Sequence, residues 1–350
     1  MLHPLSAARD HGAGFSGARV RIPHPGRDRG RRRHLRGPLR ARDRAAARGR
    51  QRELRTVSTA RIEPVQATEN RAPAVHAHVR RLAGTLESAA ARLRDGRDPE
   101  AVHDIRVAAR RLTSTLSLWD ASLDPMSSRR ARRGLRRLRR RLSRTREREV
   151  LAQQLAELIV GEPLPLREAG MIELERLARR GAASRTAAAR RVRRSQIARL
   201  VRRIESCLAA FVGASERALA DARAHADARK ERALAALAAC AEGDDDALHR
   251  ARVAVKTWRY EIECLLAASD DPRGAALPLL RELQQSLGAI HDAAVLRDFI
   301  FRRAWRVRAQ GRLDRSEALA SLSEKAARAR WRALERLPAV VARVGAPHRA

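Results

Sequence analysis

Aromatic residues, lysine and cysteine are scarce in this chain of 350 residues. Aromatic side chains account for 3% of the sequence, and only three of the 75 basic residues are lysine, so arginine carries almost all of the positive charge. The three cysteines lie far apart without a C-x-x-C spacing, which excludes a disulfide-rich scaffold and predicts neither a zinc site nor a haem site. Apolar runs are short and interrupted by arginine, so no segment is expected to span a bilayer and no membrane partner is predicted.

Acidic residues are also few for a chain with this many basic ones. The 40 aspartates and glutamates leave a formal net charge of +35 at pH 7. Such a positive surface attracts polyanions, a class that includes nucleic acid, anionic membrane and inorganic polyphosphate. A GC-rich genome explains the preference for arginine over lysine, but it does not explain the excess of basic over acidic residues.

Residues 1–65 differ in composition from the rest of the chain. Up to Arg55 the segment holds 16 arginines against four acidic residues, a net charge of +12, and glycine and proline recur without helical periodicity. Such a segment cannot bury enough apolar surface to offset its chain entropy, and it lacks the apolar centre of a signal peptide, so we predict a disordered arginine-rich extension. Two explanations stay open: an arm that binds polyanions, and a start codon assigned upstream of a true start near Val57.

A single helical domain is predicted over residues 66–345. Leucine, alanine, valine and isoleucine recur at spacings of three and four residues, and the alternation typical of strands is absent, which predicts an all-α fold. Breaks rich in glycine and proline divide the region into about eight helices. We place a first helical half at 66–212 and a second at 213–345.

Two stretches of the chain, 101–119 and 247–265, share a pattern of basic residues. Features that follow each stretch also repeat in the same order, at an offset of about 145 residues. We therefore predict an internal duplication that gives two pseudo-symmetric four-helix bundles. The matched pairs within the two stretches are His103 with His249, Arg106 with Arg252, Val107 with Val253, and Arg110 with Lys256.

The basic residues of each repeated stretch fall on one side of a helix. At about 100° per residue, His103, Arg106 and Arg110 lie within an arc of roughly 60°, opposite an apolar side that includes Ile105 and Leu112. A solvated helix face normally mixes charges of both signs to gain i,i+4 pairs. This stripe is cationic in both copies and therefore carries self-repulsion, which an external polyanion would relieve.

Three segments resemble motifs of one known family. GRDPEAVHDIRVAARRL at 96–112 resembles the signature of the CHAD domain, the conserved histidine α-helical domain. LHRARVAVKTWRYEIE at 248–263 and LQQSLGAIHDAAVL at 283–296 resemble its second-half motif and the helix that follows. The resemblance implies two four-helix bundles with a basic groove between them, binding of inorganic polyphosphate, and a cytoplasmic location at polyphosphate granules.

When the family motifs are matched residue by residue, the resemblance implies a group of polyphosphate-binding residues in each half. Thr113 stands where the family pattern has arginine, and Ser143 and Glu147 stand where the second copy keeps glycine and aspartate, so the first half is expected to bind more weakly. The implied polyphosphate-binding residues are His103, Arg106, Arg110, Arg136, Arg140, Arg146, His249, Arg252, Lys256, Arg259, Arg281 and His291.

Three functions stay open at this point. Arginine forks and lysine charges suit a phosphate chain that has no bases, and scarce aromatics disfavour stacking on single-stranded nucleic acid, so a non-catalytic polyphosphate-binding protein is the first hypothesis. The second is a basic protein that associates with nucleic acid through the extension and the arginine-dense run at 129–148.

The third hypothesis is a phosphohydrolase. Against it, Glu261 and Glu263 are followed by Leu265 where the E-x-E-x-K pattern of triphosphate-tunnel enzymes requires lysine, and the chain has no Walker loop. We therefore predict no catalytic residue, no metal and no cofactor. Nucleic acid is expected only as a weaker, non-specific partner, and the oligomeric state stays open.

Overall fold

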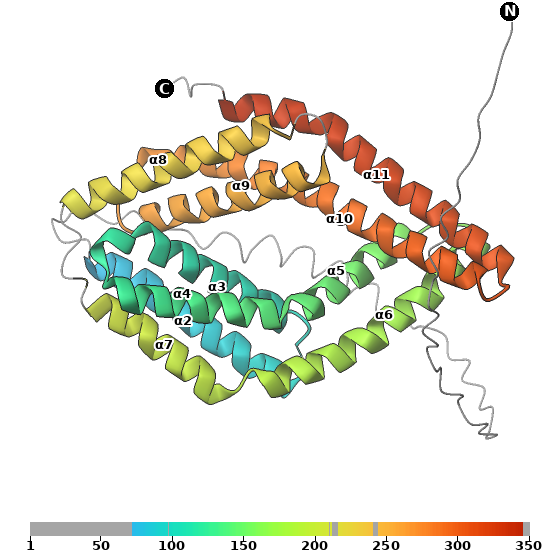
Figure 1. Cartoon of the computed structure of the whole chain (residues 1–350), viewed down its shortest axis with the longest axis horizontal. Helices are drawn as coiled ribbons and strands as arrows, with labels where there is room; N and C mark the ends of the chain where they lie inside the picture. Colours follow the sequence, from blue (N-terminus) through green and yellow to red (C-terminus); the bar gives the residue numbers. More distant parts are fainter. Residues whose placement is uncertain (1–71, 97, 210, 212–215, 241–243, 346–350) are drawn as a thin grey trace, which may run out of the picture. The chain divides into compact units, whose positions relative to one another are not determined.

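The fold is described from a computed structural model, which describes residues 72–96, 98–209, 211, 216–240 and 244–345. The extension predicted at 1–65 and the predicted boundary between the two halves lie outside these residues. Within them the structure has ten α-helices, two short 3₁₀ helices and no strand, which confirms the all-α fold (Figure 1). The α-helices are α2 (Ala72–Asp95), α3 (Ala101–Leu118), α4 (Pro125–Arg141), α5 (Ser143–Leu158), α6 (Leu164–Arg191), α7 (Arg194–Ala209), α8 (Glu216–Ala238), α9 (Asp245–Leu266), α10 (Leu277–Arg308) and α11 (Leu313–Gly345), with the 3₁₀ helices η1 (Asp120–Ser122) and η2 (Pro272–Ala276).

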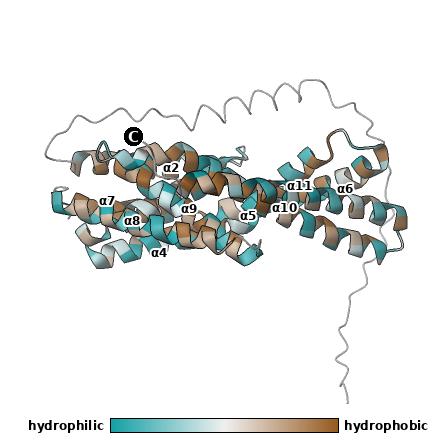
Figure 2. Cartoon of the chain, turned by 90° about the horizontal axis from the view of Figure 1, so that it is seen from above, coloured by the Kyte–Doolittle hydropathy of each residue, from teal (hydrophilic) through white to brown (hydrophobic). Residues whose placement is uncertain are grey.

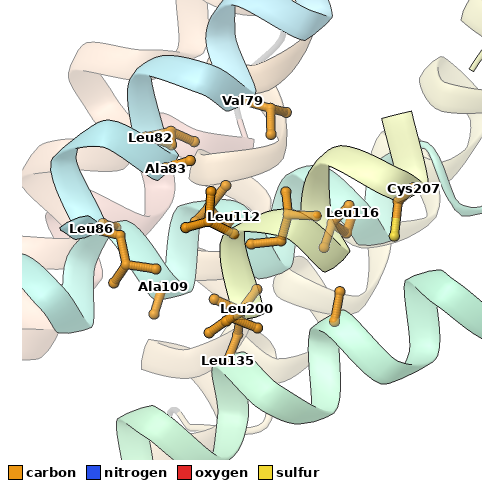
Figure 3. Close-up of a cluster of buried hydrophobic side chains, with 14 of the residues drawn as sticks. Val79, Leu82, Ala83, Leu86, Ala109, Leu112, Leu116, Leu135, Leu200 and Cys207 are labelled. Carbon is orange, nitrogen blue, oxygen red and sulfur yellow. The ribbon is translucent and has the colours of Figure 1, made fainter. Parts of the chain in front are cut away.

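The first apolar core lies between α2, α3, α4 and α7 (Figure 3). Leu86, Leu112 and Leu135 come from three of these helices and are completely buried. Helix α8 and the end of α9 add side chains to the same core, among them Leu219 and Leu265. The first bundle is therefore closed in part by helices of the second half.

Two further apolar cores share the long helices α10 and α11. The N-terminal half of α10 and the C-terminal half of α11 pack with α8 and α9 around Leu283 and Leu337. The other halves of α10 and α11 pack with α5 and α6 around Leu177 and Leu319. Seen by hydropathy, the labelled helices carry both hydrophobic and hydrophilic stretches, as amphipathic helices do when they pack on one side (Figure 2).

The two halves differ in where their helices break. Helix α4 gives way to α5 at Leu142, and α6 gives way to α7 near Val192, whereas α10 and α11 continue for 32 and 33 residues. At the first break, Ser143 Oγ donates to the carbonyl oxygen of Arg140 at 2.9 Å, a local bond that competes with the helical ladder. These breaks explain why ten helices are present where the sequence predicted about eight. The order of elements otherwise runs in parallel in the two halves, and the duplication itself stays a prediction.

One buried carboxylate joins α6 to both long helices. Glu173 is 1% exposed, and Arg303 of α10 donates to it from Nε at 2.7 Å and from Nη2 at 3.1 Å. Arg315 of α11 donates to the same carboxylate, and Arg176 pairs with it from the following turn of α6. The negative charge is therefore compensated from three helices, as a buried ion requires.

Replacing this carboxylate should destabilise the fold. In Glu173→Gln the buried Arg303 and the half-buried Arg315 lose their counter-charge, so we expect the free energy of unfolding to fall by about 3 kcal/mol. Glu175→Gln, at an exposed position of the same helix, is the matched control and should change it by less than about 0.5 kcal/mol. Urea unfolding followed by circular dichroism measures both, and equal values for the two variants would contradict the anchoring role of Glu173.

Candidate anion-binding site

A cavity of about 940 Å³ lies between the two halves. Its walls come from α3, α4 and α5 on one side and from α8, α9 and α10 on the other. Ten arginine and lysine side chains and two histidines line it, against three carboxylates. The cavity therefore has a strongly positive potential and favours an anionic occupant.

The cationic stripes predicted on α3 and α9 face this cavity. Asp244 caps α9 by accepting a hydrogen bond from the N–H of Ala247 at 2.8 Å, which fixes where the helix begins. From that start the three- and four-residue spacing brings Arg252 and Lys256 to the cavity, as it brings Arg110 on α3. The apolar residues on the other side of each helix are buried in the cores.

Eight of the twelve residues implied by the family resemblance line the cavity. They come from five helices, two of them in the second half, so the fold brings together residues that are far apart in sequence. Two of them, His249 and His291, lie with their ring centroids 5.5 Å apart. The eight residues are Arg106, Arg110, Arg136, Arg146, His249, Arg252, Lys256 and His291.

Arg140 and Arg259 are placed away from this cavity. Arg140 lines a different cavity, between α4, α5 and α6. Arg259 is 8% exposed, pairs with Glu263 at 3.5 Å, and places its guanidinium 4.6 Å from the ring centroid of Tyr260. Its charge is thus compensated inside the protein, whereas the family resemblance implies a contact with the ligand.

His103 and Arg281 also lie outside the lining. His103 begins the cationic stripe of α3, where burial, followed by the charge of Arg146, lowers its pKa to about 4. Arg281 lies near the start of α10, and its buried Nε has no hydrogen-bond partner among the described residues. The cavity therefore takes in neither of these two implied positions.

Four arginines of the lining were not singled out from the sequence. Arg132 and Arg139 belong to the dense run on α4, where spacing alone does not separate cavity-facing from solvent-facing arginines. Arg302 lies three helical turns after His291 on α10, so extending the periodicity of that helix would have found it. Arg229 comes from α8, outside the repeated stretches, and no sequence signal marks it.

The positive charges of the cavity are only partly compensated. Asp292 lies 3.8 Å from Arg252, and Glu261, which is fully buried, lies 3.4 Å from Nε of Arg229. Within the described part of the chain, no carboxylate lies within 4.0 Å of Arg110 or Lys256. These unpaired charges are the part of the cavity that an anion would stabilise most.

Burial and mutual repulsion already shift the titration of the lining residues. Burial, with added effects from Arg252 and Arg110, lowers the pKa of Lys256 to about 7. The pKa of His291 is lowered by burial and then by Arg252, and that of Arg139 is lowered to about 10 by burial and then by Arg110. In the absence of an anion, His291 is therefore largely neutral at pH 7 and Lys256 is only partly charged.

Several nitrogen donors in the cavity wall lack partners. Arg106 Nη1 donates to the carbonyl oxygen of Arg139 at 2.8 Å, which fixes its side chain across α3 and α4. The buried Nε atoms of Arg139 and Arg252 have no hydrogen-bond partner among the described residues. Donors of this kind cost free energy when they stay unsatisfied, and phosphate oxygens are suitable acceptors for them.

Neither a metal centre nor a membrane span emerges from the described residues. Histidine, cysteine, aspartate and glutamate side chains in this part of the chain form no group of three suited to hold a metal ion. None of its helices is both long enough and apolar enough to cross a membrane.

Comparison with protein families gives a match that covers most of these helices. The family model described as the CHAD domain matches residues 74–300. The chain belongs to the CHAD-domain family. This region contains the cationic stripes of α3 and α9 and almost the whole cavity lining.

Two solved structures have the same CHAD-type fold. The crystal structure of the CHAD domain from the plant Ricinus communis is 22% identical and covers 83% of this chain and 96% of its own, with a TM-score of 0.59. PptA from Streptomyces chartreusis is 20% identical and covers 74% of this chain and 97% of its own, with a TM-score of 0.53. No curated protein sequence matches the chain. At these identities the two structures support the fold and leave the ligand to be argued from the cavity.

The lowered pKa of Lys256 predicts a pH-dependent stability. Between about pH 7 and its ordinary value of 10.5 the unfolded chain keeps a proton that the folded protein has released, so the free energy of unfolding should rise with pH over this range. Urea unfolding without added polyanion, at about pH 7 and about pH 9, measures the difference. Lys256→Met should reduce the rise, whereas Lys230→Met, at an exposed lysine of α8, should keep it. An identical rise in wild type and Lys256→Met would contradict the assignment.

Proposed function

We propose that this CHAD-domain protein binds inorganic polyphosphate and does not act on it chemically. The observation that carries the proposal is the cavity in which the cationic residues of α3 and α9 face each other with few carboxylates between them. We further propose that it does so in the cytoplasm, in association with polyphosphate granules. An occupant with a negative charge on every unit would relieve the repulsion between the residues of both stripes that line the cavity.

The lining suits a phosphate chain in its chemistry. Guanidinium groups form bidentate hydrogen bonds to phosphate oxygens, and Lys256 adds a compact charge. A bound anion would also raise the pKa of Lys256 and of His291, so both would gain positive charge as the ligand binds. Binding is therefore expected to take up protons near neutral pH and to weaken as the pH rises from about 6 to about 8.

The same lining disfavours nucleic acid. Apart from its two histidines, the described residues that line the cavity include no aromatic side chain on which a base could stack. A cavity of about 940 Å³ also suits a single unbranched chain better than a duplex, which presents its phosphates on the outside of a wide rod. A nucleic-acid-binding protein remains the alternative function, because the exposed arginines of α4 provide a surface of that kind.

Neutralising the cavity should abolish polyphosphate binding. In the full chain carrying Arg110→Gln, Arg252→Gln and Lys256→Gln, three charge-assisted contacts are lost, so we expect the affinity for long-chain polyphosphate to fall at least about 100-fold. Fluorescence anisotropy at near-physiological salt measures it, and wild-type affinity should fall steeply as salt is raised.

A matched control distinguishes the loss of the cavity contacts from the loss of net positive charge. Arg217→Gln, Lys230→Gln and Arg232→Gln remove the same three charges from exposed positions of α8, and this variant should bind within about threefold of wild type. Equal losses in the two variants would contradict the cavity as the site. Duplex DNA that competes as well as polyphosphate would favour the nucleic-acid alternative, and phosphate release from polyphosphate with magnesium would contradict a non-catalytic role.

A further inference from the structure

A second basic cavity lies on the outer side of the break between α4 and α5. It measures about 540 Å³, and five arginines from α4, α5 and α6 line it together with small and hydroxyl side chains. Among the residues that the structure describes, no acidic side chain contributes to this lining. We call it the outer groove; its arginines are Arg140, Arg141, Arg144, Arg148 and Arg191.

The outer groove has a floor of short side chains and a rim of long ones. Ala183, Ala187 and Ala188 lie on the α6 side, where they leave space between the arginines. The hydroxyl groups of Thr145 in α5 and Ser184 in α6 form a hydrogen bond of 2.9 Å, which links the two helices at the outer groove. The hollow is thus fixed by packing, while four of its five arginines are exposed to solvent.

The charges of the outer groove are not compensated within the protein. In the described part of the chain, none of its five arginines lies within 4.0 Å of a carboxylate. A carboxylate is close by, but Glu149 pairs with Arg185 at 3.6 Å and with Arg146 at 3.8 Å. Among the groove arginines, Arg141 donates to a glutamine oxygen and Arg148 to a backbone carbonyl, and neither bond neutralises charge.

The outer groove lies at the break between α4 and α5, where the ends of both helices contribute to its lining. Ser143, Arg144 and Thr145 form the first turn of α5, at the positive end of its dipole, and Arg140 and Arg141 lie in the last turn of α4, where their charges face the negative end of that helix. In the second half α10 continues without a break through the matching positions. The outer groove therefore depends on the break at Leu142. The first half has this break, and the matching stretch of α10 in the second half does not.

Ser143 lines both cavities, so the outer groove and the central cavity meet at the break. We propose that the outer groove is a second polyphosphate-binding site, which holds a further length of the chain that occupies the central cavity. This inference rests on the proposed function of the central cavity. The groove is open and without aromatic side chains, which suits a flexible phosphate chain better than stacked bases.

The test compares ligands that differ in length. Tripolyphosphate is too short to occupy both sites, whereas a long-chain polyphosphate can, and joining two sites through one ligand strengthens binding by effective concentration. In the full chain with Arg144→Gln, Arg148→Gln and Arg191→Gln, we expect the affinity for long-chain polyphosphate to fall about tenfold or more, with tripolyphosphate changed by less than about twofold.

The control variant neutralises three exposed arginines outside both cavities, Arg167→Gln, Arg179→Gln and Arg312→Gln, and should bind both ligands as wild type does. Circular dichroism and thermal unfolding establish that each variant is folded. If the groove variant binds long-chain polyphosphate as tightly as wild type does, the proposal is wrong and the outer groove is only a solvated surface. Loss of duplex DNA binding with polyphosphate binding intact would overturn it in favour of a nucleic-acid surface.

The failure of this inference can be told apart from the failure of the proposed function. If the outer groove fails, its variant binds both ligands normally while the central-cavity variant still loses both. If the central cavity fails, its variant keeps its affinity for tripolyphosphate and for long chains, whatever the groove variant does. If only the groove variant loses polyphosphate affinity, both proposals are wrong: the central cavity is not the binding site, and no single polyphosphate chain occupies both cavities.

Discussion

The fold must hold many like charges close together, and their repulsion opposes folding. Arg110 and Lys256 face the same cavity from different halves of the chain, where burial lowers the pKa of Lys256 and the charges of Arg252 and Arg110 lower it further. The opposite sides of the same helices are lined by leucine, alanine and isoleucine buried in the cores, and this burial offsets the repulsion. The apolar cores thus hold like charges together in the cavity at a cost in electrostatic free energy. A bound anion would lower that cost.

The helical periodicity of the sequence was sufficient to predict the centre of the site. His249, Arg252 and Lys256 recur at spacings of three and four residues, and a helix that buries Trp258 on its other side must present them together. This reasoning is local, because it needs only the rotation per residue and the position of the apolar face. It therefore predicted the all-α fold and the cationic stripes of α3 and α9, whereas Arg136, Arg146 and His291 were implied by the resemblance to the CHAD family.

Contacts and breaks that local spacing does not show decided the positions of two implied residues that lie outside the cavity, Arg259 and Arg140. Arg259 follows the spacing of the stripe, but Glu263 and Tyr260 capture its charge, and Glu263 also lies 3.3 Å from Arg111 of α3. Arg140 lies within the run that supplies Arg136 to the cavity, yet the break at Leu142 leaves it in the outer groove. Neither the partner of an arginine nor the consequence of a break follows from the spacing of residues along one helix.

The third apolar core has a consequence for how the chain acquires its structure. Leu155 and Leu177 of α5 and α6 are buried against α10 and α11, and Glu173 finds Arg303 130 residues later in the sequence. During synthesis from the N-terminus, α5 and α6 are therefore complete long before the surfaces that cover them exist. The apolar sides of α5 and α6 and the carboxylate of Glu173 can therefore be covered only once α10 and α11 have been made, so this third core forms after the whole first half has been synthesised.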